Sequence, residues 1–251
     1  MKSIIEVGKN LANKIVLVRL DLNVPIENGK ITDTNRIDKI VPTLDYLIKK
    51  NTKLILISHI GRPKGKVDEN FSLKPVGDNL SKKLNRKIKL INKNIYQLNK
   101  SNLFEAKDYK IILLENIRFY AEEEKNDEKF GKHLASLGDL YVNEAFSCSH
   151  RPHSSISKIS KYIDVYAGLL FTSEVQALNK VTKDIAKPIS CIIGGSKIST
   201  KIKIIENLVS KFDNIIIVGG MANSFLKYFG QNIGKSIYEE NSVEIIKKII
   251  E

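Results

Sequence analysis

The chain has little of what stabilises secreted proteins or crosses membranes. It holds only two cysteines, Cys148 and Cys191, in 251 residues. Two cysteines make no disulfide framework and fit no zinc-binding spacing, so a reducing compartment is expected. No apolar run approaches the ~20 residues that a membrane-spanning helix needs, and the first ten residues do not resemble a signal peptide. These absences predict a soluble, cytoplasmic protein.

Acidic residues are scarce beside basic ones. The chain has 41 Lys+Arg against 28 Asp+Glu, a formal net charge of +13. Such an excess favours anionic partners, namely nucleic acid, a membrane surface or phosphorylated small molecules. Most of it is lysine scattered along the chain, which is equally typical of solvated faces. Only six arginines are present, and their positions are more informative: Arg19, Arg36, Arg62, Arg86, Arg118 and Arg151.

Apolar runs of strand length alternate with helical patterns along the chain. Strands are predicted at 14–22, 53–60, 87–91, 110–119, 139–146, 189–194 and 214–219. Helices are predicted at 33–50, 73–84, 127–137, 154–161, 171–183, 200–211, 222–229 and in the last ten residues. Strands of continuous Ile, Leu and Val are buried on both faces, and their alternation with helices indicates parallel βαβ units. The pattern predicts an α/β protein with two doubly wound, Rossmann-like domains.

The predicted domains differ in completeness. Residues 1–168 form the first domain, 169–186 an interdomain helix, and 187–251 the start of a second domain. The second has only two clear strands, too few for a stable doubly wound sheet. Its last helical run (VEIIKKII) is still apolar at Ile250, next to the final residue, and has no C-cap glycine. We therefore expect the second domain to be incomplete in this chain.

Polar side chains follow three strands of the first half. Asp21 and Asn23 follow the first strand, His59 and Arg62 the second, and Arg118 the fourth. Ligands of open α/β sheets bind beyond the carboxyl ends of the strands, so one crevice should receive all of these side chains.

Two further arginines are expected at the same crevice. Arg36 begins the first helix, and Arg151 follows the fifth strand. Arginine suits bidentate recognition of phosphate or carboxylate. Each arginine taken singly could instead pair with a surface carboxylate, and Asp21 and Asn23 are also turn residues.

Glycines mark a second candidate site. Gly194-Gly195-Ser196-Lys197 follows a predicted strand, and Lys201 comes four residues after Lys197. Glycine lets backbone N–H groups approach phosphate, and a helix N-terminus favours anions. We expect the two lysines on one face of the first helical turn. A plain strand-to-helix turn remains the alternative. The P-loop-like run 230–236 has one residue too few between its glycines and follows a helix, so it is interpreted as a turn.

Several segments together resemble the phosphoglycerate kinases, in that family's order and spacing. They are RLDLNVP (19–25), SHIGRP (58–63), LLENIRF (113–119), NEAFSCSHRPHSS (143–155), GGSKISTKI (194–202) and VGGMANSFLKYFGQNIGKS (218–236). The resemblance covers essentially the whole chain. It departs at Thr200, where the family has aspartate, at 147–149, and at 171–173. The family's later nucleotide-binding acid and C-terminal glycine-rich motif are missing.

The resemblance implies a glycolytic kinase that transfers a phosphoryl group between 1,3-bisphosphoglycerate and ADP, giving 3-phosphoglycerate and ATP. It implies a substrate site of Asp21, Leu22, Asn23, Arg36, His59, Ile60, Gly61, Arg62, Arg118 and Arg151. It implies a nucleotide site of Gly194, Gly195, Lys197, Lys201 and Gly219, with Arg36 and Lys197 catalytic. Mg²⁺ would arrive with ADP or ATP, its protein ligand lying beyond residue 251. A monomer without nucleic-acid or membrane partners is expected.

Two other functions remain open from the sequence. A binding module could keep the phosphoglycerate site without transferring phosphate. A basic nucleic-acid-binding protein is suggested by charge alone, without any recognised motif.

Overall fold

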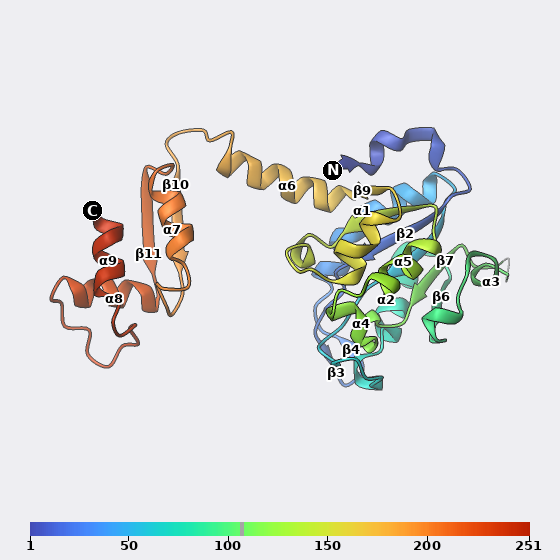
Figure 1. The fold of residues 1–251 in the computed structure, drawn as a ribbon, viewed down its shortest axis with the longest axis horizontal. Helices are drawn as coiled ribbons and strands as arrows, with labels where there is room; N and C mark the ends of the chain where they lie inside the picture. The colour runs from blue at the N-terminus through green and yellow to red at the C-terminus, as the bar shows by residue number, and fades with distance from the viewer. Residues whose placement is uncertain (106–107) are drawn as a thin grey trace. The chain divides into compact units, whose positions relative to one another are not determined.

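A computed structural model describes residues 1–105 and 108–251 of the chain. The chain divides into two compact units, Met1–Val175 and Gln176–Glu251. The described residues contain no helix that is long and apolar enough to cross a membrane. Each unit is described by itself below, and Figure 1 gives the labels of the elements.

The first unit is built on a seven-stranded sheet in the order β1-β9-β8-β2-β5-β7-β6, in which all neighbours are parallel. Its strands are β1 (Lys2–Ser3), β2 (Ile15–Leu20), β5 (Lys53–Ile57), β6 (Ile88–Ile91), β7 (Ile111–Leu114), β8 (Leu140–Glu144) and β9 (Val165–Ala167). A small antiparallel pair, β3 (Ile26–Glu27) and β4 (Lys30–Ile31), stands apart from it. The central strands are almost entirely aliphatic, as expected of strands covered on both faces.

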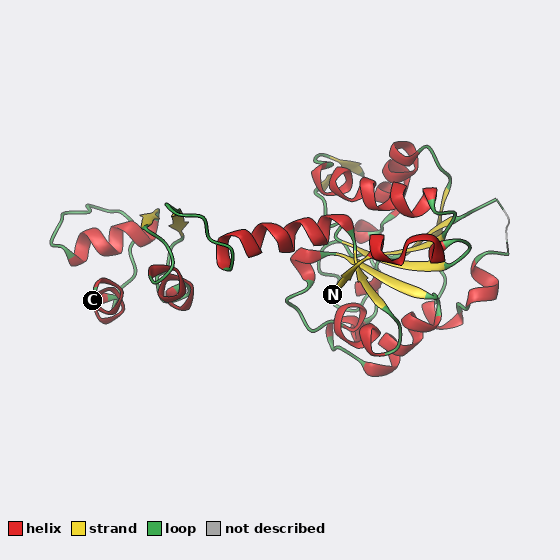
Figure 2. Ribbon diagram, turned by 90° about the horizontal axis from the view of Figure 1, so that it is seen from above, coloured by secondary structure: helices red, strands yellow, loops and turns green. Residues whose placement is uncertain are grey.

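Alternate residues of the central strands enter two separate cores. Val18 of β2 packs with one core, together with helices α1 (Asn35–Lys49) and α2 (Lys74–Leu84). Leu17 of the same strand packs with the other core, which includes α5 (Glu128–Ser136). Helices therefore cover both faces of the sheet, as Figure 2 shows for this unit. The first unit is doubly wound, as the sequence predicts.

Shorter elements connect these layers. They are α3 (Lys100–Leu103), α4 (Ala121–Glu124), and the short 3-10 or π helices Ile4–Leu11, Glu69–Phe71, Ile95–Gln97, Ile117–Phe119, Phe146–Cys148, Ser154–Lys158 and Ile159–Lys161. Helix α6 (Leu169–Thr182) leads out of the first unit.

The second unit contains a two-stranded parallel sheet of β10 (Ser190–Gly194) and β11 (Asn214–Val218). Its helices are α7 (Ile202–Val209), α8 (Gly220–Tyr228) and α9 (Val243–Ile250). Four apolar residues form its buried core: Ile198, Ile205, Met221 and Ile246.

Three local expectations were wrong. The strand predicted at 110–119 ends at Leu114, because Asn116 caps a 3-10 turn by accepting from the N–H of Arg118 at 3.1 Å. The helix predicted from residue 200 begins at Ile202, so Lys197 lies in the preceding turn and not in a helical turn with Lys201. The helix predicted from residue 33 begins at Asn35, with Thr34 at its N-cap position.

Candidate functional site

The strand order brings the predicted site residues to one edge of the first unit. Strands β8, β2, β5 and β7 are consecutive neighbours, and all are parallel. Their carboxyl ends therefore share one edge of the sheet, where ligands of open α/β sheets bind. We call this region the crevice. The residues that follow these strands there are Asp21, Asn23, His59, Arg118, Ser147, Cys148 and Arg151.

Asp21 and Asn23 are held by partners on other elements. The Asp21 carboxylate is ion-paired with Arg36 of α1 and accepts a hydrogen bond from the Ser147 hydroxyl. The Asn23 Oδ1 accepts from the N–H of Gly61 at 2.9 Å. Asp21 also accepts from the N–H of Asn23 at 3.2 Å, so the predicted turn chemistry is present as well.

His59 lies beside a fully buried arginine that the site prediction missed. Arg19, in β2, is 0% exposed, and its Nη2 lies 3.1 Å from Nδ1 of His59. Burial lowers the pKa of His59 to about 2, helped by the positive charges of Arg19 and Arg118. His59 is therefore neutral at physiological pH. An arginine inside an otherwise aliphatic strand was the available signal, since arginine is almost never fully buried without partners.

Arg118 carries unused hydrogen-bonding capacity inside the protein. Its guanidinium is 2% exposed, and Nη1 donates to the Gly61 carbonyl at 2.8 Å. Its Nε and Nη2 are buried and have no hydrogen-bond partner among the described residues, although Nε lies 3.5 Å from Oε1 of Glu124, within ion-pair distance. Burial lowers its pKa, and the charges of Arg19 and Arg151 act in the same direction. Buried donors without partners are costly, which points to an anionic ligand for this guanidinium.

The remaining predicted substrate residues occupy different environments. The side chains of Leu22 and Ile60 lie in the hydrophobic core, so only their backbones face polar groups. The N–H of Leu22 already donates to Ser58 Oγ at 3.1 Å. Arg62 is exposed, and Arg151 is half-buried with its Nε 3.3 Å from Nε2 of His150.

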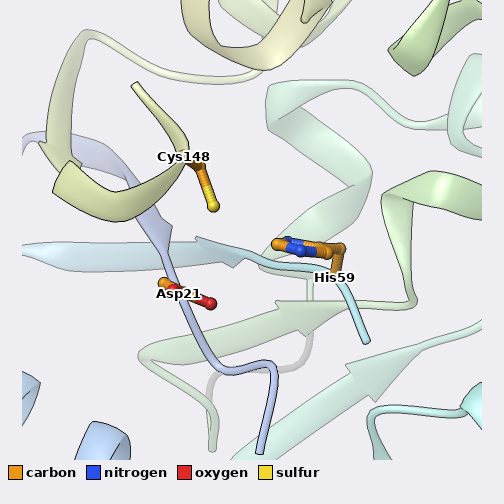
Figure 3. Close-up of side chains that lie close together, drawn as sticks. All are labelled: Asp21, His59 and Cys148. Carbon is orange, nitrogen blue, oxygen red and sulfur yellow. The ribbon is translucent and has the colours of Figure 1, made fainter. Parts of the chain in front are cut away.

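Asp21, His59 and Cys148 each offer one ligand-type atom, and these atoms lie within 4.8 Å of one another (Figure 3). Asp21 is already paired with Arg36, and Nδ1 of His59 already accepts from Arg19. Positive groups surround the trio, since Arg118 and Arg151 both act on His59. Such a field attracts anions and opposes a cation. The trio also combines nitrogen and sulfur with oxygen, which does not suit Mg²⁺.

A buried carboxylate at the end of β8 anchors the start of α6. Glu144 is 1% exposed, and its two oxygens accept from the N–H groups of Leu170 and Phe171, both at 3.0 Å. The Thr43 hydroxyl also donates to it. Burial raises the pKa of Glu144, and these three donors oppose the rise. Glu144 thus acts as an acidic cap in the first turn of a helix.

The second unit brings its predicted glycines together. Gly194 pairs with Val218, so Gly195 and Gly219 follow adjacent strand ends. Gly219 has a φ of 69°, and an added Cβ there would lie 3.5 Å from the Gly195 carbonyl oxygen. Lys197 is exposed and Lys201 is half-buried in the same turn. The arrangement fits a plain strand-to-helix turn and a phosphate-binding turn equally well.

Another hollow of the first unit lies away from the crevice. It has a volume of about 930 Å³ and is lined mainly by apolar residues next to β6, including Leu90, Ile91 and Tyr120. A smaller one of about 220 Å³ reaches Asp21, Arg36 and Ser147 and so belongs to the crevice.

The fold and the crevice define a class: a doubly wound α/β protein with arginines gathered at the carboxyl ends of its strands. A family model described as phosphoglycerate kinase matches residues 6–251. The chain therefore belongs to the phosphoglycerate kinase family.

Curated relatives and solved structures agree with this family. The chain is 46% identical over 242 residues to the phosphoglycerate kinase of Wolbachia sp. subsp. Drosophila simulans, covering 96% of this chain and 61% of the relative. The phosphoglycerate kinase structure from Coxiella burnetii is 40% identical, with a TM-score of 0.84 over 96% of this chain and 61% of that one. The phosphoglycerate kinase structure from Pyrococcus horikoshii OT3 is 26% identical, with a TM-score of 0.82. The match covers 100% of this chain and 65% of that one. The chain thus spans about three fifths of the length of these relatives.

Proposed function

We propose that the first unit binds 3-phosphoglycerate, or its 1,3-bisphosphate, in the crevice. One observation carries this proposal: among the described residues Arg118 presents two buried donor atoms without hydrogen-bond partners, and its Nη2 also has no ion-pair contact. A phosphate offers several acceptor oxygens and would satisfy both donors at once. Arg62 and Arg151 would complete the anion site, while Asp21 and Asn23 would meet the hydroxyl and carboxyl end.

The proposed reaction belongs to the whole kinase and not to the first unit alone. A carboxylate oxygen of 3-phosphoglycerate attacks the terminal phosphorus of ATP, the bond to the bridging oxygen breaks, and ADP leaves; the reverse direction makes ATP. Transfer is direct, without a covalent enzyme intermediate. Positive groups stabilise the charge that spreads over the equatorial oxygens. Arg36 of the first unit and Lys197 of the second are the proposed catalytic residues.

The nucleotide would bind at the glycine turn of the second unit, at Gly194, Gly195, Lys197, Lys201 and Gly219. The only cluster of metal-ligating side chains found among the described residues is the trio in the crevice, which does not suit Mg²⁺. We propose that the ion arrives on the phosphates of ADP or ATP. The enzyme would act as a monomer in the cytoplasm.

Titration calorimetry at low salt tests the proposed site, with 3-phosphoglycerate added to the folded chain. Replacing Arg62 by alanine should weaken binding by about 1.5–3 kcal/mol, the range for hydrogen bonds to charged groups. Arg62→Lys should recover only part, because bidentate geometry is lost. Arg86→Ala is the matched control, since Arg86 is exposed at the end of α2 and donates to the Asn85 carbonyl at 3.0 Å. Absence of heat from a sample with a normal melting curve would reject the site.

A further inference from the structure

A line of buried polar side chains leads from Glu123 to the ring of His59. Glu123 Oε1 lies 2.6 Å from Ser155 Oγ, and its Oε2 accepts from the N–H of Ser155 at 2.9 Å. Ser155 Oγ lies 2.9 Å from Arg19 Nε, and Arg19 Nη2 lies 3.1 Å from His59 Nδ1. Glu123, Ser155 and Arg19 are all 0% exposed, and His59 is 3% exposed. Four side chains from four separate segments thus form one continuous buried network.

The chemistry of arginine sets the direction of every bond in this network. A guanidinium has five N–H donors and no acceptor, so Arg19 must donate at both contacts. Ser155 Oγ accepts from Arg19 and therefore uses its own proton toward Glu123. His59 Nδ1 accepts from Arg19 and therefore carries a lone pair. A neutral imidazole with a lone pair on Nδ1 has its proton on Nε2.

We propose that Glu123, Ser155 and Arg19 are positioning residues that fix His59 as its Nε2–H tautomer. The ring of His59 extends from its backbone toward the space between Asp21 and Cys148, as Figure 3 shows. The histidine then offers the crevice a neutral N–H donor in a fixed position. Such a donor complements a phosphate or carboxylate oxygen. The identity of that ligand rests on the proposed function, whereas the tautomer does not.

The charges around His59 favour the same assignment. The positive charges of Arg19, Arg118 and Arg151 act on the ring, as does His153, and all disfavour a second proton on it. Glu123 is the buried acid of the network, and its Oε1 lies 3.9 Å from His153 Nδ1. Burial raises the pKa of Glu123, whereas Arg19 and the hydrogen bonds from Ser155 oppose the rise. Ser155 and Arg19 separate Glu123 from the ring, so a carboxylate at this position compensates Arg19 and not a histidinium.

The fixed tautomer also decides what the trio of Asp21, His59 and Cys148 can bind. A metal ion needs a free lone pair on an imidazole nitrogen. Here Nδ1 is occupied by Arg19 and Nε2 carries the proton. The ring can therefore donate to an anion but cannot ligate a cation without breaking the network.

Nuclear magnetic resonance of ¹⁵N-histidine-labelled chain tests the tautomer directly and without ligand. The chain has four histidines, so the His59 signals can be assigned by their loss in His59→Gln. Two-bond ¹H–¹⁵N correlations distinguish Nε2–H from Nδ1–H. We expect the Nε2–H pattern alone in the wild type, unchanged by Zn²⁺. A wild-type Nδ1–H pattern, or a Zn²⁺-induced shift of the His59 nitrogens, overturns the proposal.

Two variants break the network at different points. Arg19→Met removes the donor to Nδ1 and should leave both tautomers populated. Ser155→Ala removes only the link to Glu123 and should allow detectable Nδ1–H, even if Arg19→Met does not fold. Ser154→Ala is the matched control, because Ser154 is equally buried but bonds to the carbonyls of Glu122 and Asp127. An identical tautomer in Ser155→Ala and Ser154→Ala means that the network does not position the ring.

Calorimetry with 3-phosphoglycerate separates this proposal from the proposed function. Ser155→Ala should lower the affinity by about 3- to 10-fold, the effect of one weakened hydrogen bond, whereas Ser154→Ala should stay within about twofold. Equal affinities of the two variants count against the positioning role. If the wild type shows the expected tautomer but binds no 3-phosphoglycerate, the proposed function fails and the tautomer assignment stands.

Discussion

Both units of this chain contain short aliphatic strands, but the strands are buried to different extents in the two units. In the first unit, β2, β5, β7 and β8 are buried on both faces. In the second unit, β10 and β11 alternate between exposed and half-buried residues, and Ile192 is 72% exposed. An aliphatic run therefore predicts a strand, but its burial depends on how many neighbouring elements the sheet provides.

The two candidate sites differ in the same way. The crevice of the first unit holds buried charged groups whose positions are set by other side chains, and all six arginines lie at or before Arg151. The glycine turn of the second unit relies on backbone shape and on two lysines, with Lys197 exposed. A preformed site depends on networks across several strands, and only the first unit has enough strands to build them.

Hydrogen exchange should show the largest difference between the units. We expect amides of β2 and β5 to exchange about 10³-fold more slowly than those of β10 and β11, because exchange protection follows burial of the hydrogen-bonded backbone. Mass spectrometry of peptides from all four strands in one sample measures this under identical conditions. Equal protection in the two units would remove the contrast.

Acid unfolding of the first unit should show an intermediate effect. An unfolded histidine takes up a proton near pH 6.5, whereas folded His59 resists protonation down to about 2. The unfolded state therefore binds more protons in this window, so stability is lost as the pH falls from about 6.5 toward 2. One such group changes the unfolding free energy by up to about 1.4 kcal/mol per pH unit.

The variant His59→Gln isolates this contribution. Denaturant unfolding should be measured in buffers about one pH unit apart, from about pH 4 to about pH 7. The unfolding free energy of the variant should change less steeply with pH than that of the wild type. Glu128, whose pKa is lowered to about 2 by hydrogen bonds from Lys158, Tyr162 and Lys161, is present in both proteins and cancels from the comparison. Identical slopes would show that His59 does not resist protonation.

Lys197→Ala should have the smallest effect on the first unit. Lys197 lies in the second unit, and the crevice is built from residues of the first. We expect the affinity for 3-phosphoglycerate to remain within about twofold of the wild type. A contact that Lys197 makes only in the transition state would change the turnover rate and leave substrate binding unchanged. Calorimetry beside Arg62→Ala makes the contrast quantitative. A tenfold loss on removing Lys197 would show that the two sites are not independent in binding.

Much of the first unit could be predicted from its sequence. Continuous aliphatic runs and helical periodicity located the five main strands and three main helices, because burial on two faces leaves a strong pattern. The N-terminal pairing of Lys2–Ser3 with β9 was not predicted, since two- and three-residue strands carry no periodicity. The early end of β7 was missed because the apolar Ile117 and Phe119 continue the pattern in a 3-10 turn.

The candidate site was predictable only in part. Strand ends located Asp21, His59 and Arg118, because topology alone brings such positions together. The roles of Glu123 and Ser155 depend on contacts between segments 32 residues apart, which no local pattern encodes. Arg19 was visible as an anomaly in its strand, but its partner His59 became evident only in three dimensions.

Because His59 is neutral, the pH dependence of ligand binding in the crevice would come from the proposed ligand and not from this histidine. A histidine that does not titrate near neutrality adds no proton exchange of its own to binding. The pH dependence of binding would then come from the phosphate of 3-phosphoglycerate, because a phosphate monoester loses its second proton near about pH 6. The guanidinium groups of the crevice would discriminate between the monoanion and the dianion, so the ligand itself would report the acidity of its surroundings.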